Sequence, residues 1–593
     1  PNLPAAISNH IDSYLNIGPK KKEVPQKFDF QVDINNSPLI YEVLVPNLNA
    51  FIPGELKGSF DSEAEKLTLD IEMEKIDYNG LNVEDFAVHI SSDPAKLNYN
   101  IGFKEFSSGK IVLERTSLGG VIQNNVAEIN LNVKDQEERD KIKIASRLVS
   151  TLPGIYKLMV LPDVIFHQEQ WSVARDNFIE IGKNGLFVQG LNLSREQAHL
   201  IVNTTSRDQN ADLDINFKNF RLSTLSRIVE RGEDSLVRGR LTGKISLLKY
   251  KTPHAAFVSD LFIWKLSLKG SIVGNLNVKA DNLTEDRFTV DVKVSGNGNK
   301  NDVRINGFMQ TTPTSTNLNF DVDIVQFALQ SIQGFTNGQL ANSSGDIKGN
   351  FKVTGTTAQP LVNGSVNFID ARTLITAINQ TVVIKNERID ISPEAVSFPH
   401  FTIRDAQNNT AVVNGAVNMT AFKDFRFNLE ISTNDFMALN STYKQNKTFN
   451  GRIILDSRIK ITGTPALPII DSKIKLLPGS VISFTVPESK LTADKGEGVV
   501  EFDIDTVNLH RIMLNGLRGI RTKSEFKGID LTANIEVDRR STLKLCLDPS
   551  STDSLILKGD AVLGFGIDQS GKLSLVGTYI IASGSYELTL QDI

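Results

Sequence analysis

Apolar and polar residues alternate along most of this chain with a period of two. Near the N-terminus, Phe28, Phe30 and Val32 alternate with Asp29 and Gln31. A β-strand places successive side chains on opposite faces, so this period predicts strands with one apolar and one polar face. Similar runs begin at Leu67, Leu97, Ala127, Phe288, Leu318, Phe427, Phe502, Leu531 and Leu543.

Turn signals separate many of these runs, and helix signals are few. Asn-Gly pairs, which favour tight hairpin turns, stand at 79–80, 184–185, 306–307, 337–338, 363–364, 414–415, 450–451 and 515–516. Helical spacing is confined to Ala5–Leu15, Leu222–Val229 and Leu329 with Ile332. Strand–helix–strand units are absent from the pattern, which argues against a parallel α/β enzyme fold. We therefore predict an all-β chain built from successive hairpins, with a few short helices.

A glycine-spaced strand pattern recurs in the chain. The motif Gly-x-[Leu/Ile]-x-Gly-x-[Phe/Ile] starts at Gly54, Gly239 and Gly345, with a looser copy at Gly451. The last three copies are evenly spaced, since 345 − 239 and 451 − 345 both equal 106. Upstream of two copies, Leu213–Ile228 aligns with Phe320–Phe335 at a shift of 107 residues. Glycines in a strand let a sheet bend, and stacked repeats touch only their neighbours, so a repeated module is predicted.

Repeated bending in one sense predicts a single curled sheet. At roughly 13 residues per strand and turn, the chain would form about 45 strands, on the order of 200 Å of sheet. Open sheets rarely exceed about ten strands unless they curl or split. We predict a long curled antiparallel-type sheet, a β-taco or repeating β-groove, with an apolar concave face. The alternative is a row of separate β-sandwiches, but no Pro/Gly/Ser linker separates the modules.

The concave face supplies the candidate site. Side chains from one thin sheet would not fill such a hollow, so lipid tails are a natural occupant. The sequence leaves open which alternate face points inward in every strand. The residues predicted to line the groove are Leu67, Leu69, Ile71, Leu97, Tyr99, Ile101, Phe103, Phe288, Val290, Val292, Leu318, Phe320, Val322, Ile324, Phe351, Val353, Phe427, Leu429, Ile431, Phe502, Ile504, Leu531, Ile535, Val537, Leu543, Leu545 and Leu547.

Composition narrows the function classes. The 593 residues include 64 basic and 69 acidic ones, giving a net charge of -5, which argues against a nucleic-acid-binding protein. Hydrophobic residues make up 40% of the chain, enough for a large core. Cys546 is the single cysteine, so the chain has no intrachain disulfide and no Cys-based metal site. No apolar run approaches the roughly 18 to 20 residues that span a bilayer.

The candidate catalytic and metal-binding motifs in the sequence are incomplete or have another explanation. The densest group around a histidine is His167 with Asp163 and Glu169, which is more typical of a surface loop than of a metal site. The stretch Gly566–Lys572 matches the first part of a phosphate-binding loop. Leu573 follows instead of the Ser or Thr that would hold magnesium, and the pattern continues as a strand. We read this stretch as a hairpin turn and predict no catalytic residue, no metal, no cofactor and no enzyme activity.

Several short segments in the C-terminal part of the chain form a recognisable series. They are Gly463–Pro468, Leu477–Val481, Ile529–Asp538, Leu547–Pro549, Leu557–Ala561, Gly571–Tyr579 and Ser583–Leu590. In order and spacing these segments resemble the conserved domain of TamB proteins in the style of the Bacteroidota branch, over about residues 450–593. A weaker similarity to the same family covers Trp171–Gly185.

This resemblance implies a periplasmic β-taco of the AsmA-like, bridge-type lipid-transfer superfamily. Such proteins connect the inner and outer bacterial membranes, move phospholipid, and dock through their C-terminus on a TamA-like outer-membrane β-barrel protein. We expect the N-terminal inner-membrane anchor and the last strands of the family to lie outside this chain. The expected divisions are 1–205 for the N-terminal part of the groove, 206–450 for the repeat modules, and 451–593 for the TamB-type region.

Three function classes remain after the sequence analysis. The first is a conduit for phospholipid. The second is a chaperone whose open sheet edge pairs with strands of nascent outer-membrane β-barrel proteins. The third is an adhesin or structural repeat protein with filled cores. Lipid identity and the direction and driving force of transfer do not follow from the sequence.

Overall fold

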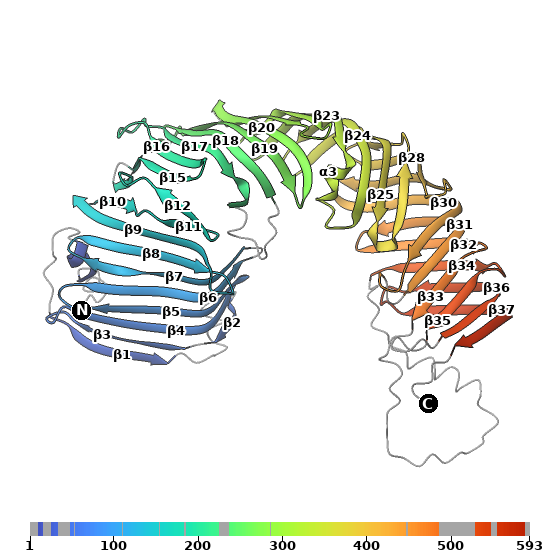
Figure 1. Cartoon of the computed structure of the whole chain (residues 1–593), viewed down its shortest axis with the longest axis horizontal. Helices are drawn as coiled ribbons and strands as arrows, with labels where there is room; N and C mark the ends of the chain where they lie inside the picture. The colour runs from blue at the N-terminus through green and yellow to red at the C-terminus, as the bar shows by residue number, and fades with distance from the viewer. Residues whose placement is uncertain are drawn as a thin grey trace, which may run out of the picture. The chain divides into compact units, whose positions relative to one another are not determined.

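The computed structural model of the chain describes residues 10–15, 25–33, 48–52, 54–108, 111–152, 154–182, 185–224, 237–284, 286–420, 422–445, 449–485, 528–546 and 554–587. Most of these residues lie in strands, which confirms the all-β prediction. The chain divides into two compact units, Pro1–Asn297 and Gly298–Ile593. Within each unit, strands that follow one another in the sequence lie side by side (Figure 1).

The first unit holds an antiparallel sheet. Several of its strands are interrupted, so that two short strands occupy the place of one: β2 and β3 both pair with β4, and β10 and β11 both pair with β9. The pairs β12/β13 and β14/β15 continue in the same way. The strands are β1 (Lys27–Asp33), β2 (Leu48–Ile52), β3 (Glu55–Asp61), β4 (Lys66–Tyr78), β5 (Leu81–Ser92), β6 (Leu97–Ser108), β7 (Ile111–Gln123), β8 (Val126–Lys134), β9 (Asp140–Leu152), β10 (Ile155–Val160), β11 (Val164–Phe166), β12 (Glu169–Val173), β13 (Phe178–Gly182), β14 (Gly185–Gln189), β15 (Leu191–Arg195), β16 (Ala198–Thr204), β17 (Leu213–Arg221), β18 (Val237–Leu248), β19 (Ala256–Leu268), β20 (Ser271–Thr284) and β21 (Arg287–Ser295).

The second unit holds a sheet of the same kind, with one departure. Strands β26 and β27 both pair with β25, and β32 and β33 both pair with β31. Strands β32 and β34, and β33 and β35, are parallel, whereas the other pairs in the unit are antiparallel. The strands are β22 (Asp302–Thr311), β23 (Thr316–Ala328), β24 (Leu340–Gly355), β25 (Pro360–Ile375), β26 (Gln380–Ile384), β27 (Arg388–Ile391), β28 (Ala395–Arg404), β29 (Thr410–Thr420), β30 (Lys423–Ser441), β31 (Phe449–Thr464), β32 (Leu467–Leu476), β33 (Val481–Thr485), β34 (Asp530–Val537), β35 (Thr542–Cys546), β36 (Ser554–Ile567) and β37 (Leu573–Glu587).

Short helical segments join some strands, as predicted. Residues 10–15 and 222–224 are helical, α3 spans Leu329–Gln333, and the 3-10 turn η2 spans Thr376–Ile378. The two aligned stretches of the repeat have the same order of elements: a strand, a short helix and a glycine-spaced strand. They also share a register shift, between Phe217 and Phe220 in β17 and between Ile324 and Phe327 in β23. The repeated module is therefore a structural unit.

Strands bend at residues in the left-handed backbone conformation. Such residues sit at register shifts, where one extra residue in a strand forms a bulge and increases the local twist. In three of them the backbone N–H is held by a side chain of the neighbouring strand. These bonds run from Asn219 to Thr242 Oγ1 (3.1 Å), from Lys265 to Asn275 Oδ1 (3.0 Å), and from Asp435 to Asp456 Oδ1 (2.8 Å). The bend residues are Asn219, Lys265, Asn342, His400 and Asp435, with φ between 49° and 57°.

The hairpin prediction from Asn-Gly pairs is wrong at four positions. The pairs at 306–307, 363–364, 414–415 and 450–451 lie inside β22, β25, β29 and β31, whereas 79–80 and 337–338 lie in turns. The mid-strand glycines face bulky residues across the sheet: Gly307 faces Phe320, and Gly364 faces Phe351. A Cβ on Gly364 would lie 2.7 Å from a ring carbon of Phe351. These glycines therefore allow the aromatic ring of the neighbouring strand to pack close to the backbone. The pair at 515–516 lies outside the described residues.

Candidate functional site

Rows of apolar residues cross the first unit on one face of its sheet. Residues that stand opposite one another in adjacent strands point to the same face, so the strand register defines each row. We call this side of each sheet the apolar face and the opposite side the outer face. One row crosses seven strands from β3 to β9 through Leu56, Ile71, Val88, Ile101, Leu118, Leu131 and Ile144. A second row runs toward β21 through Leu193, Leu200, Phe217, Gly243, Leu261, Val278 and Val292.

The second unit has equivalent rows. In these rows, residues that are more than 100 positions apart in the sequence, such as Val322 and Phe427, lie on the same face of the sheet. One row passes through Ile305, Val322, Phe351, Gly364, Ile391, Val396, Val417, Phe427 and Gly463. Another passes through Gly415, Leu429, Ile461, Ile470, Leu531 and Ile567.

The exposure of the predicted lining residues distinguishes this face from a closed core. Leu67 and Leu97 are buried, at 5% and 3% exposure, while the other predicted residues that the structure describes are half-buried. Their neighbours along the strand, such as Asp321 and Asp323, are exposed on the outer face. The apolar face is thus partly covered and partly accessible. Phe502, Ile504 and Leu547 lie outside the described residues.

Part of the apolar face of the first unit is filled by the protein itself. Trp171 is 1% exposed and packs with Val164, Phe220 and Leu241 in a buried cluster. Ile144 of β9 and Ile263 of β19 pack against the same cluster, although their strands are far apart in the sheet order. The sheet must therefore curl for them to meet. The period of two does not reveal this cluster, because β11 and β12, which contribute Val164 and Trp171, are only three and five residues long. The signal that could have located it is the pair of aromatic residues Trp171 and Phe220.

The helical turn 10–15 covers another part of this face. Tyr14 and Leu15 are buried at 6% and 7% exposure, and the Tyr14 hydroxyl donates a hydrogen bond of 2.6 Å to the Asp93 carbonyl. His10 packs edge-on against Phe60, with ring centroids 5.7 Å apart, and its Nε2 lies 2.8 Å from Ser92 Oγ. Burial lowers the pKa of His10, and a nearby carboxylate only partly opposes this shift.

The second unit also closes locally. Leu439, Ile453, Leu455 and Leu476 form a buried cluster, and Ile378 of η2 packs against it. The Asn379 side chain donates a hydrogen bond to the backbone carbonyl of Asn440. The apolar faces are therefore open surfaces interrupted by local plugs.

The C-terminal part of the chain matches a known protein family. Residues 399–592 match the family model described as the TamB C-terminal domain. The chain carries a TamB C-terminal domain. The family assignment made from the sequence is confirmed, and the matched region begins earlier than the expected residue 450. No curated protein and no solved structure matches the chain.

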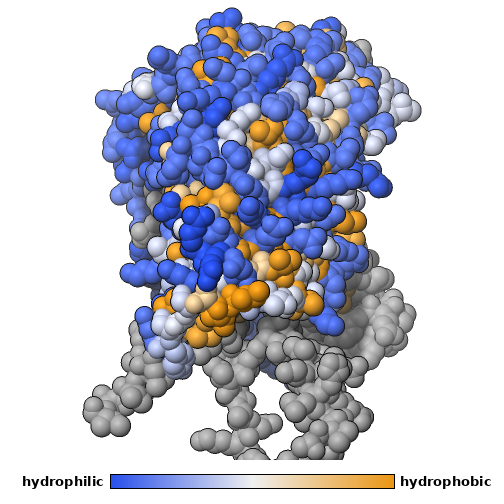
Figure 2. All heavy atoms as spheres, turned by 90° about the vertical axis from the view of Figure 1, so that its right-hand side faces the viewer, coloured by the Kyte–Doolittle hydropathy of each residue, from blue (hydrophilic) through white to orange (hydrophobic). Residues whose placement is uncertain are grey.

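The TamB domain includes strands β29 to β37, and its last strands differ from the rest of the outer face. Figure 2 shows a mostly hydrophilic surface on which hydrophobic side chains gather toward the lower end, where β36 and β37 lie in Figure 1. The exposed apolar residues there include Val562, Val576 and Ile580, at 70%, 72% and 66%. Within the described residues, β37 pairs only with β36. Strand β37 therefore presents apolar side chains and one edge that no described strand covers.

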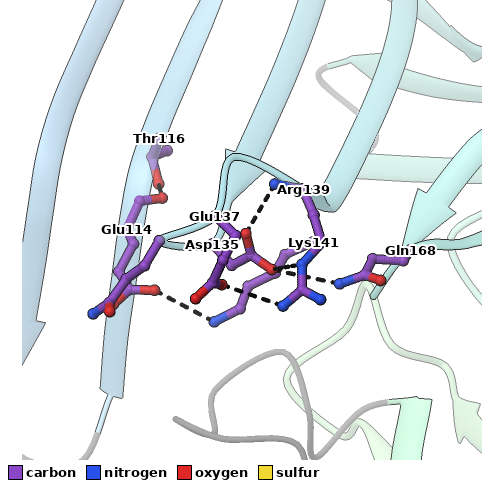
Figure 3. Close-up of polar contacts among 8 residues, drawn as sticks. Glu114, Thr116, Asp135, Glu137, Arg139, Lys141 and Gln168 are labelled. Carbon is purple, nitrogen blue, oxygen red and sulfur yellow. Dashed lines mark hydrogen bonds and ion pairs between the residues drawn. The ribbon is translucent and has the colours of Figure 1, made fainter.

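A buried polar network lies at one end of β7 in the first unit (Figure 3). Glu114 and Lys141 are less than 10% exposed, and Lys141 Nζ lies 3.7 Å from the Glu114 carboxylate. Arg139 Nε donates to Asp135 Oδ2 at 2.8 Å, and Gln168 donates to the same oxygen at 3.4 Å. Burial opposes the ionisation of Asp135, but the bonds from Arg139 outweigh it and hold the pKa of this carboxyl below its usual value. The network ties the β8–β9 hairpin to β7 and to the turn before β12.

The other motifs considered in the sequence can now be compared with the structure. The stretch that resembles a phosphate-binding loop is a turn between β36 and β37, closed by bonds from Asp568 N to Lys572 O and from Gly571 N to Asp568 O, as predicted. In the part of the chain that the structure describes, no group of three His, Cys, Asp or Glu side chains is arranged to hold a metal ion. Among the same residues, no helix is long and apolar enough to cross a bilayer.

Proposed function

We propose that the apolar faces of this TamB-family chain carry the acyl chains of phospholipids, and that the chain works as a periplasmic conduit between the inner and outer membranes. The half-buried state of the predicted lining residues supports this proposal. An apolar side chain that is still accessible can gain further burial from a ligand, at about 25 cal/mol per Å² of apolar surface. A lipid tail that lies along a row such as Val322–Phe351–Val396 would cover it without displacing a buried core.

Charge on the apolar face tests the conduit. Val322→Glu places a carboxylate among apolar neighbours and should block lipid transfer, because the charge loses its hydration when acyl chains cover it. Asn317→Glu is a matched control on the same strand, since Asn317 is exposed and alternates with the apolar residues. The measurement is transfer of labelled phospholipid between donor and acceptor membranes. Equal transfer by the two variants, both folded by circular dichroism, would count against a conduit.

Contact with lipid provides the direct test. A photo-crosslinking residue at Phe320, Val322 or Leu545 should capture phospholipid in cells, while one at the outer-face residue Asp323 should not. Capture at none of the three apolar positions would remove the basis of the proposal.

A second candidate function is assembly of outer-membrane β-barrel proteins. The edge of β37 that no described strand covers favours it. An exposed strand edge offers unpaired N–H and C=O groups that can extend the sheet of another protein. The same edge is our proposed docking place for a TamA-like outer-membrane partner. Crosslinkers at Thr578 should capture a barrel protein if this proposal holds, and crosslinks to barrel proteins without any lipid crosslinks would favour assembly over transport.

A further inference from the structure

Two aromatic rings stand on the outer face of β19 in the first unit. Phe262 and Trp264 are 37% and 40% exposed. They alternate with Leu261 and Ile263, which pack against the buried cluster around Trp171 on the other face. The two rings therefore lie on the outer face of the sheet and do not belong to the buried cluster.

The rings are framed by hydrogen-bonding side chains. Phe262 stands opposite Thr242 of β18 and Asn277 of β20, and Trp264 stands opposite Arg240. The Arg240 guanidinium carbon lies 5.9 Å from the centroid of the Trp264 ring, and Lys265 Nζ lies 4.3 Å from it. Cations over an indole face are held there by the ring quadrupole, so both charges stay beside the exposed ring.

These two cations differ from those in the next row of the sheet. In that row, Lys279 pairs with Asp260 at 3.4 Å, and Lys244 pairs with Asp214 at 3.0 Å. The described contacts of Arg240 are with the Trp264 ring and, at 3.3 Å, with an amide oxygen, and both groups are neutral. The positive charge beside the ring is therefore not balanced by a described carboxylate.

We propose that this surface binds an anionic glycan, meaning an oligosaccharide whose sugars carry carboxylates. The aliphatic face of a pyranose ring packs flat on an exposed aromatic ring through many weak dispersion contacts. Arg240 and Lys265 supply charge-assisted hydrogen bonds to a sugar carboxylate. Thr242 and Asn277 offer a hydroxyl and an amide to the sugar hydroxyls. The site is independent of the apolar face and of the function proposed for it.

The surroundings of the rings favour a glycan over a bilayer. An interfacial membrane anchor needs a broad apolar area that enters the headgroup region. Here, hydrogen-bonding residues border the two rings on both neighbouring strands, and a row of ion pairs follows. A hydrated sugar chain leaves those groups in water, whereas a bilayer would dehydrate them at a cost.

Tryptophan fluorescence can test the site in the whole chain. The chain has two tryptophans, and Trp171 is buried, so a ligand that stacks on the outer face changes the emission of Trp264. The probe is an oligogalacturonate, compared with its uncharged methyl ester. We expect saturable quenching with a Kd on the order of 0.1–1 mM, and at least about tenfold weaker binding of the ester. Absence of saturation at about ten times that concentration would overturn the proposal, as would equal binding of acid and ester.

Variants separate recognition from folding. Trp264→Ala should reduce binding by about tenfold or more, measured by calorimetry. The double variant Arg240→Gln with Lys265→Gln keeps the ring and should lose the preference for the acid over the ester. Lys352→Gln, an exposed and ion-paired lysine of the second unit, is the control and should bind normally. Unchanged preference in the double variant would refute the site even if Trp264→Ala fails to fold.

Two competitors complete the test. Anionic phosphatidylglycerol vesicles or a single-stranded oligonucleotide that binds the surface at least as tightly as the oligogalacturonate would replace the glycan proposal. Normal phospholipid transfer by the Trp264 and Arg240/Lys265 variants is expected, because the surface lies on the other face of the sheet.

Discussion

Gly364 shows how single residues control the packing of this sheet. It lies in β25 between Phe351 of β24 and Ile391 of β27, on the apolar face. A Cβ at this position would lie 2.0 Å from the Asn350 carbonyl oxygen, which real Cβ atoms do not approach. The missing side chain therefore allows two backbones and an aromatic ring to come close together.

Alanine substitution tests this reading. Gly364→Ala should destabilise the second unit by roughly 1–3 kcal/mol, because the backbone must shift to admit the methyl group. Gly564→Ala is the control, since its Cβ would make only an ordinary contact of 3.7 Å with the Val576 carbonyl oxygen. Differential scanning calorimetry on both variants measures the difference. Equal melting would show that the close approach is not a constraint.

At the scale of elements, a few residues with positive φ bend the strands. Asp435 has φ of 49° inside β30, and its backbone N–H is satisfied by Asp456 of the next strand. A residue with a branched Cβ avoids this conformation, whereas glycine adopts it freely.

Substitution at Asp435 should therefore depend on backbone conformation more than on charge. Asp435→Val is expected to lower stability by about 1–2 kcal/mol, while Asp435→Gly should change it by less than about 1 kcal/mol. Hydrogen exchange of peptides from β30 and β31 measures the local effect. If glycine were as damaging as valine, the side chain and not the bend would be important.

The contact between the helical turn 10–15 and the sheet should depend on pH. Folding lowers the pKa of His10 from its ordinary value of 6.5, so the unfolded segment binds the proton more tightly. The contribution of His10 to stability is therefore complete above about pH 6.5 and is lost as the pH falls below that value. The ionisable groups that face His10 are Glu65, whose charge opposes the shift, and the Tyr14 hydroxyl.

Hydrogen exchange of residues 10–15 checks this dependence. After correction for intrinsic rates, protection should be weaker at about pH 5.5 than at about pH 7.5. His10→Gln should remove most of the pH dependence. His89→Gln should keep it, because His89 is an exposed outer-face residue beside Asp70. A pH dependence that survives His10→Gln would assign the effect to another group.

At the scale of the whole molecule, the contacts run mainly between neighbouring strands. Bodies of this kind unfold in parts, because each module is stabilised by its neighbours and not by one central core. Both tryptophans, Trp171 and Trp264, belong to the first unit, so their fluorescence reports only that unit. Circular dichroism reports the strands of both units.

Chemical denaturation should therefore give transitions that do not coincide when followed by tryptophan fluorescence and by circular dichroism. The expected separation reflects independent unfolding of the two units. Superimposed curves at equilibrium would instead indicate that the chain unfolds as one cooperative body.

Much of the architecture follows from the sequence because its cause is local. The period of two fixes which side chains share a face, so runs such as Leu318–Ile324 and Phe427–Ile431 were correctly predicted as strands with one apolar side. The module repeated near residues 213 and 320 was also visible, down to its short helix. The expected division at residues 205 and 450 stays a prediction, as does the inward role of each lining residue.

Other features of the fold were decided only by the tertiary structure, because these features depend on contacts between residues that are distant in the sequence. Asn-Gly signals a turn only when the chain can reverse there, and at Gly307 and Gly364 a facing aromatic ring requires a strand instead. The parallel pairing of β32 with β34, and the filling of the apolar face by Trp171, depend on which strands meet after the sheet has curled. Alternation along the chain therefore determined the two faces, and curling determined how much of the apolar face stays open.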